Sequence, residues 1–200
     1  RQMCIRDSAA ILPHTRKVAY LSGNEIAFVS PDGPSYIELE GNPIKKSPSI
    51  VNYDPLSAAK GEFKHFMLKE IHEQPESMMN TLRGRVKFDN KTVHLETIPY
   101  SNEEISAIER IVLIGMGTSL HAAMVGRIWI ESLAGIPAEV DNSSEFRYRD
   151  PILGPNTLVI SVCQSGETAD TLAAMSEASN KGAKQITLCN YPGTQTSRIA

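Results

Sequence analysis

Glycine and hydroxyl residues gather at two places in the sequence, each directly after a run of aliphatic residues. The run Ile111–Ile114 leads into Gly115-Met116-Gly117-Thr118-Ser119, and the run Thr157–Val162 leads into Cys163-Gln164-Ser165-Gly166-Glu167-Thr168. A turn from a strand into a helix presents unpaired backbone N–H groups at the positive end of the helix dipole, and side-chain hydroxyls add further donors. Each turn therefore predicts an anion site, and a phosphate suits these neutral donors.

The residues around these turns alternate between strand and helix patterns. Strands are expected over 111–114, 138–140, 157–162 and 185–189, with helices over 119–134 and 167–180 between them. Aliphatic runs without polar alternation are typical of parallel strands covered on both faces. The order predicts an α/β fold with a doubly wound parallel sheet, in which ligands bind at the carboxyl ends of the strands. Two turns on adjacent strands would then share one ligand.

Three other interpretations of these residues are available. Gly115-Met116-Gly117 resembles the start of a dinucleotide-binding motif, but the third glycine of that motif is missing. The hydroxyls of Ser119 and Thr168 could serve only as helix caps, which is the simpler interpretation for either turn alone. Cys163 could be a nucleophile, although the sequence positions no histidine to activate it. The two turns taken together favour a shared phosphate.

Composition narrows the class of protein. The 20 basic and 23 acidic residues are interspersed and give a net charge of −3, so no nucleic-acid-binding face is expected. No apolar run approaches the roughly 18 residues of a membrane-spanning helix. The three cysteines show no paired spacing, which argues against a disulfide framework and a zinc site and favours a reducing compartment, the cytoplasm. No metal or cofactor is expected.

The first hundred residues have a different pattern. Strands over 17–21, 25–29 and 35–39 predict a β-meander, and the pair Lys45-Lys46 that follows is expected to be solvated. A helix over 63–74 is expected to end at Pro75, which begins a second helix to Leu82. The apolar residues of the first of these helices form a stripe typical of core or interdomain packing, namely Phe63, Phe66, Met67 and Ile71. Ser101 and Glu104 fit a capping box for a helix that ends near Arg110.

The sequence resembles the isomerising glutamine:fructose-6-phosphate aminotransferases. The similarity rests on the segment from Cys163 to Leu172 and on five further segments, which are 14–18, 69–75, 117–119, 134–137 and 144–149. It implies a β-rich remnant of an Ntn-type glutaminase domain over 9–57, a helical linker over 58–83 and a truncated first SIS domain, a phosphosugar-binding domain, over 84–200. Residues 1–8 fit none of these and are expected to be a non-native leader.

The resemblance also implies a function. The family converts fructose 6-phosphate to glucosamine 6-phosphate with glutamine as nitrogen donor, and the implied phosphate-binding residues are Thr118, Ser119, Cys163, Gln164, Ser165 and Thr168. Cys163 stands where the family usually has serine, and a thiol is the weaker donor. The family's catalytic residues have no counterpart in this sequence, so the chain alone is expected to be inactive and the full-length enzyme to be a homodimer. A phosphosugar sensor and a simple phosphosugar isomerase are the alternatives.

Overall fold

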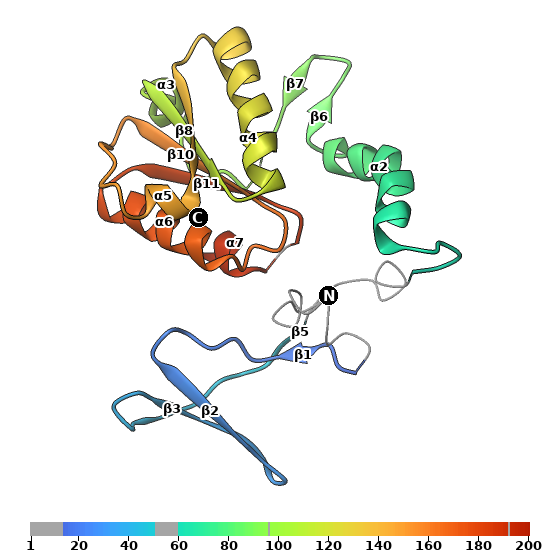
Figure 1. The fold of residues 1–200 in the computed structure, drawn as a ribbon, viewed down its shortest axis with the longest axis vertical. Helices are drawn as coiled ribbons and strands as arrows, with labels where there is room; N and C mark the ends of the chain where they lie inside the picture. Colours follow the sequence, from blue (N-terminus) through green and yellow to red (C-terminus); the bar gives the residue numbers. More distant parts are fainter. Residues whose placement is uncertain (1–13, 51–59, 96, 192) are drawn as a thin grey trace. The chain divides into compact units, whose positions relative to one another are not determined.

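The structure is a computed structural model that describes residues 14–50, 60–95, 97–191 and 193–200 (Figure 1). The chain divides into two compact units, Arg1–Lys64 and His65–Ala200, which are described separately. The predicted leader over residues 1–8 lies outside the described residues.

The first unit is built from short antiparallel strands. Strand β2 (Glu25–Ser30) pairs with β3 (Gly33–Glu38), and β3 pairs with β4 (Pro43–Ile44). Strand β1 (Lys17–Val18) pairs instead with β5 (Ser49–Ile50), so the prediction of a meander that begins at residue 17 is wrong.

A single side chain accounts for part of this difference. The ammonium of Lys46 donates a hydrogen bond to the Tyr20 carbonyl at 2.7 Å and forms an ion pair with Glu25. The Tyr20 carbonyl therefore bonds to a lysine where the predicted strand 17–21 would have continued. Lys46 was expected to be solvated, but its side chain is only 17% exposed. This contact joins residues 26 positions apart, so it could not be predicted from the local sequence pattern.

Helix α2 (Phe66–Leu82) opens the second unit and is followed by a hairpin of β6 (Val86–Lys87) and β7 (Thr92–Val93). Pro75 lies inside α2, so the prediction of two separate helices is wrong. Figure 1 shows α2 changing direction along its length, which is how a helix accommodates a proline that cannot donate to the preceding turn. The predicted packing stripe is largely solvent-exposed in this chain, with Met67 at 71%.

The rest of the second unit is a four-stranded parallel sheet with the order β11-β10-β8-β9. Its strands are β8 (Arg110–Gly115), β9 (Ala138–Asn142), β10 (Thr157–Cys163) and β11 (Lys184–Cys189). Its helices are α3 (Asn102–Ser106), α4 (Thr118–Trp129), a π-helical turn (Ile130–Ala134), α5 (Ser143–Phe146), α6 (Ala169–Asn180) and α7 (Gln195–Ile199). The alternation of strand and helix predicted for this half is confirmed.

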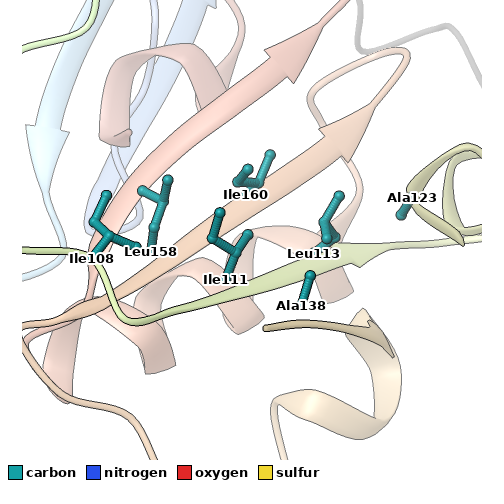
Figure 2. Packing of buried hydrophobic residues seen from close by; sticks show 7 residues of the cluster. All are labelled: Ile108, Ile111, Leu113, Ala123, Ala138, Leu158 and Ile160. Carbon is teal, nitrogen blue, oxygen red and sulfur yellow. The ribbon is translucent and has the colours of Figure 1, made fainter. Parts of the chain in front are cut away.

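Each face of the sheet has its own core. Figure 2 shows the first cluster, in which Ile111, Leu113 and Ile160 of the sheet lie with Ala123 of α4. The second cluster brings Val112 and Ile114 together with side chains of α5 and α6, namely Phe146, Ala174, Met175 and Ala178. Successive strand residues thus point to opposite faces, and both faces are covered. The doubly wound fold class is confirmed for this half.

The helix boundaries follow local sequence signals. The capping box is present, because the Ser101 hydroxyl accepts from the Glu104 N–H at 3.2 Å and the Glu104 carboxylate accepts from the Ser101 N–H at 2.9 Å. Helix α3 ends at Ser106, earlier than predicted, because Arg110 already belongs to β8. Gly135 ends the π-helical turn with a left-handed φ of 66°, as its type predicts.

Candidate functional site

The two predicted turns follow neighbouring strands. Strands β8 and β10 pair in parallel register up to Gly115 and Val162, so the two turns leave the same edge of the sheet. From β8 the chain passes through α4 to β9 on one side, whereas β10 and β11 lie on the other side of β8. The gap between β8 and β10 is therefore the topological switch point, where open parallel sheets bind their ligands.

The first turn, Gly115–Ser119, is shaped by its glycines. A Cβ on Gly115 would lie 3.0 Å from the Leu120 nitrogen and 3.1 Å from the Ser119 carbonyl carbon, so the strand end approaches the first turn of α4 at backbone distance. Gly117 is the N-cap of α4 and has a positive φ of 54°. The helix dipole makes this end of α4 positive, while the N–H groups of Ser119 and Leu120 donate to the Met116 and Gly117 carbonyls at 3.1 Å. Thr118 and Ser119 are the first two residues of this helix.

The second turn, Gln164–Thr168, joins β10 to α6. Gly166 adopts a positive φ of 67°, and the Ser165 hydroxyl accepts a hydrogen bond from the Glu167 N–H at 3.3 Å. Thr168 is the N-cap of α6, yet its side chain makes no capping hydrogen bond. The interpretation of Thr168 as merely a helix cap therefore finds no support in the structure, and its hydroxyl is left for another partner.

A third turn, between β11 and α7, supports the second one and was missed by sequence reasoning. There is no room for a side chain at Gly166, because a Cβ at this position would lie 2.3 Å from the Thr194 hydroxyl oxygen. The Gly166 carbonyl accepts from the Thr196 N–H at 3.1 Å, and the Glu167 carboxylate accepts from the Gln195 N–H at 2.9 Å. We refer to these contacts of Gly166 and Glu167 with residues 194–196 as the latch. The only sequence signal was the cluster of hydroxyl residues at 194–197.

The predicted phosphate-binding residues differ in exposure. Thr118 and Gln164 are exposed, whereas Ser119, Ser165 and Thr168 are half-buried. Within the described part of the chain, the hydroxyls of Thr118 and Ser119 take part in no hydrogen bond. The fold thus brings the two groups of donors to one edge of the sheet with several hydroxyls unengaged.

Cys163 is placed differently from the other predicted residues. Its sulfur lies 3.4 Å from the Thr196 hydroxyl, 3.6 Å from the Thr187 hydroxyl and 3.6 Å from the Leu188 carbonyl. The hydrogen bond with Cys189, together with burial, raises the pKa of the Cys163 thiol well above its usual range. A protonated thiol is a poor nucleophile, so the structure gives the nucleophile interpretation no support.

Acidic groups beside the second turn are already paired. Asp170 lies in the first turn of α6, where its carboxylate accepts from the Arg147 guanidinium at 2.8 Å. Glu167 is engaged with the Gln195 N–H. These contacts hold both carboxylates to fixed partners within the fold.

No group of three side chains that could hold a metal ion occurs in the described ranges, and no helix among them is long and apolar enough to cross a membrane. An open hollow lined by Glu109, Arg110 and residues 152–157 lies at the amino-terminal ends of β8 and β10. It is therefore at the opposite edge of the sheet from the two turns.

Comparison with known proteins relates the chain to phosphosugar enzymes. Residues 104–200 match the SIS domain family. The chain is 46% identical over 194 residues to the isomerizing glutamine–fructose-6-phosphate aminotransferase of Caldanaerobacter subterraneus subsp. tengcongensis, and 44% identical to that of Clostridium tetani. Each alignment covers 97% of this chain and 32% of the relative, so the chain spans about a third of the length of these curated relatives.

Solved structures agree with the sequence relationship. The C-terminal domain of glucosamine-fructose-6-phosphate aminotransferase from Francisella tularensis superposes with a TM-score of 0.63 at 35% identity, over 70% of this chain and 39% of that one. Tagatose-6-phosphate ketose/aldose isomerase from Escherichia coli shares the fold, with a TM-score of 0.52 at 19% identity over 68% of this chain and 38% of that one. The chain is thus related to the isomerizing glutamine–fructose-6-phosphate aminotransferases over a third of their length, and its residues 104–200 are a SIS domain.

Proposed function

We propose that the SIS domain of this chain binds the phosphate of fructose 6-phosphate between the turns Gly115–Ser119 and Gln164–Thr168, as part of an enzyme that makes glucosamine 6-phosphate with glutamine as nitrogen donor. The observation that carries this proposal is the parallel pairing of β8 with β10, which places two donor-rich turns at one switch point. The names of the curated relatives supply the substrate.

The site suits a phosphate more than a nucleotide. The Gly115 turn lacks a third glycine and offers two hydroxyls at the start of α4, whereas the second turn offers Ser165 and Thr168 with the amide of Gln164. Helix starts and neutral donors stabilise a phosphate without a bound lysine. In this assignment the phosphate is held by Thr118, Ser119, Gln164, Ser165 and Thr168, with the backbone N–H of Cys163 beside them.

The proposed role of this site is positioning. Holding the phosphate fixes the sugar carbonyl relative to catalytic groups, which lowers the entropic part of the barrier. We assign no catalytic residue to this chain, and we assign residues 9–57 to a glutaminase domain and 58–83 to a linker. The 200-residue chain is accordingly expected to bind the sugar phosphate and to form no glucosamine 6-phosphate.

A phosphosugar sensor is the alternative. The sugar isomerase domain of an RpiR transcription factor from Sphaerobacter thermophilus shares the fold, with a TM-score of 0.51 at 22% identity over 68% of this chain and 73% of that one. A sensor of that kind would carry a DNA-binding helix-turn-helix ahead of the SIS domain. The described residues 17–50 form β1 to β5 instead, which favours the enzyme.

Titration calorimetry with the 200-residue chain tests the site. Fructose 6-phosphate should bind and fructose should not, because the phosphate supplies the contacts. The double variant Ser165→Ala with Thr168→Val should bind about 100- to 10,000-fold more weakly, since it removes two hydrogen bonds to a charged group and each contributes about 1.5–3 kcal/mol. Ser176→Ala is the matched control, because among the described residues this hydroxyl bonds only to the Leu172 carbonyl within α6.

The outcomes separate the possibilities. Unchanged affinity in the double variant would reject the assignment of the phosphate to these turns. Equal binding of fructose and fructose 6-phosphate would reject phosphate recognition altogether. Formation of glucosamine 6-phosphate by the 200-residue chain would overturn the assignment of a purely positioning role.

A further inference from the structure

Cys163 and Cys189 stand opposite each other in the sheet. They are register partners in the parallel ladder of β10 and β11, and both are free, half-buried thiols. Neighbouring strands lie about 4.8 Å apart, which is within the range of about 4.4–6.8 Å that a disulfide spans between Cα atoms. Register partners in a parallel pair point to the same face, as the preceding pair on that face confirms: the Ser161 and Thr187 hydroxyls are 2.8 Å apart.

The two sulfurs belong to one polar network. The Cys163 sulfur lies 3.4 Å from the Thr196 hydroxyl, and the Cys189 sulfur lies 3.4 Å from the Thr194 hydroxyl. Those two hydroxyls are 3.3 Å apart. Both cysteines therefore contact the hydroxyl residues that form the latch.

The same pair adjoins the second turn directly. The Cys189 thiol donates to the Gln164 carbonyl at 3.6 Å, and Cys163 is the residue before Gln164. The Thr194 side chain packs directly against Gly166, and a Cβ on Gly166 would overlap the Thr194 hydroxyl. A change in the side-chain torsions of either cysteine therefore alters contacts that fix Gln164 and the latch.

We propose that Cys163 and Cys189 form a peroxide-sensitive dithiol, and that its oxidation to a disulfide weakens phosphate binding at the turn Gln164–Thr168. In the first half of this proposal, the pairing of the two thiols stands on the sheet geometry. The second half rests on the proposed function of the turn. A disulfide would remove the thiol contacts with Thr194, Thr196 and the Gln164 carbonyl, and so loosen the support of the turn.

The pKa values of the two thiols are shifted in opposite directions, which gives each thiol its own role. The hydrogen bond with Cys163, assisted by those with Thr194 and the Tyr191 N–H, lowers the pKa of the Cys189 thiol, whereas the pKa of Cys163 is raised. Cys189 is thus the attacking thiolate. Its sulfur forms an S–O bond to hydrogen peroxide as the O–O bond breaks, and the departing hydroxide takes up the proton that Cys189 released on forming the thiolate, which gives water. The Cys163 sulfur then attacks the sulfenic sulfur, and the released hydroxide leaves with the Cys163 proton as a second water.

Peptide mapping of the 200-residue chain tests the dithiol itself. After treatment with hydrogen peroxide and digestion without reductant, a peptide pair linked through Cys163 and Cys189 is expected in the mass spectrum, and dithiothreitol should separate it. The variant Cys4→Ser removes the third cysteine and should still form the link. A chain that carries sulfinic acid at Cys189 and no linked peptide would overturn the dithiol.

Calorimetry on the same samples tests the regulatory half. The oxidised chain should bind fructose 6-phosphate about tenfold or more weakly, the loss expected for one hydrogen bond to a charged group, and reduction should restore the affinity. In the variant Cys189→Ser, peroxide should leave the affinity unchanged. A linked chain that binds as tightly as the reduced one would overturn regulation. Absence of binding by the reduced chain would instead reject the proposed function, while the peptide map would still decide the dithiol.

Discussion

The turns Gly115–Ser119 and Gln164–Thr168 share one sequence pattern but are held in place by different means. The first is supported by its own helix, since the end of β8 approaches the backbone of Ser119 and Leu120. The second is supported by a distant segment through the latch to residues 194–196. A strand, a glycine and a hydroxyl-rich helix start thus specify a turn, whereas its rigidity depends on what packs against it.

Breaking the latch should have the largest effect. Gly166→Ala places a Cβ at 2.3 Å from the Thr194 hydroxyl oxygen and 2.5 Å from its Cβ, in a left-handed conformation. We expect the free energy of unfolding to fall by about 2–5 kcal/mol, from backbone strain and overpacking together. Urea denaturation followed by circular dichroism measures this loss. Gly182→Ala is the control, because φ is +74° there and the added Cβ meets nothing. An equal loss in free energy of unfolding in the two variants would show that the Thr194 side chain moves aside for the added Cβ.

Crowding the first turn should have a smaller effect. In Gly115→Ala the added Cβ meets the Leu120 nitrogen at 3.0 Å and the Ser119 carbonyl at 3.1–3.2 Å, and backbone atoms can move only with the whole helix start. The free energy of unfolding should fall by about 1–3 kcal/mol. The same denaturation experiment applies, with Gly154→Ala as the control because its Cβ would meet nothing within 4 Å. Amide exchange should quicken at Ser119 and not at Gln195; faster exchange at both would contradict independent support.

Removing one hydrogen bond from the latch should cost less again. Glu167→Ala deprives the Gln195 N–H of its partner at 2.9 Å and should lower the free energy of unfolding by about 0.5–1.5 kcal/mol. Glu167→Gln retains an acceptor and serves as the control. Hydrogen exchange at the Gln195 amide is the sensitive measurement, and equal protection in the alanine variant and the parent chain would remove this contact from the latch.

The smallest effect is expected at the capping box, away from both turns. The hydrogen bond from Lys184, followed by that from the Ser101 N–H, lowers the pKa of the Glu104 carboxyl below its ordinary value of 4.5. A lowered folded-state pKa contributes stability that is present above the unfolded value and is lost as the pH falls through the folded value. Glu104 should therefore titrate below pH 4.5 in carbon-detected NMR. In Lys184→Met its pKa should rise, and an unmoved titration would exclude the pairing.

Features fixed by neighbouring residues could be predicted from the sequence. The capping box at Ser101, the helix end at Gly135 and the aliphatic strands depend on local chemistry, and the structure has them as predicted. The pairing of β1 with β5 could not be predicted, because it depends on a partner about thirty residues away. The continuation of α2 through Pro75 was also missed, since a proline either ends a helix or is accommodated within it according to the packing around it.

The candidate site likewise has a part that could be predicted from the sequence and a part that could not. Both turns could be found because strand, glycine and hydroxyl residues are adjacent in sequence. The latch could not, because Thr194 and Thr196 meet Gly166 only once β11 has paired with β10. The pairing of Cys163 with Cys189 was hidden for the same reason. The absence of paired cysteine spacing had argued against a disulfide framework, whereas partners in a parallel ladder are separated by a whole strand–helix crossover.

The strand order has a consequence for how the chain behaves at high concentration. Within the described sheet β9 and β11 are the outer strands, and each presents one row of backbone groups to which another strand could add. Strand β9 carries Glu139 and Asp141, which are held by Arg110 and Arg149, and β11 begins with Lys184. The charged side chains of β9 disfavour the docking of a foreign strand there, whereas β11 carries a single charge, Lys184, which is paired with Glu104, so protection against edge-to-edge aggregation rests mainly on β9.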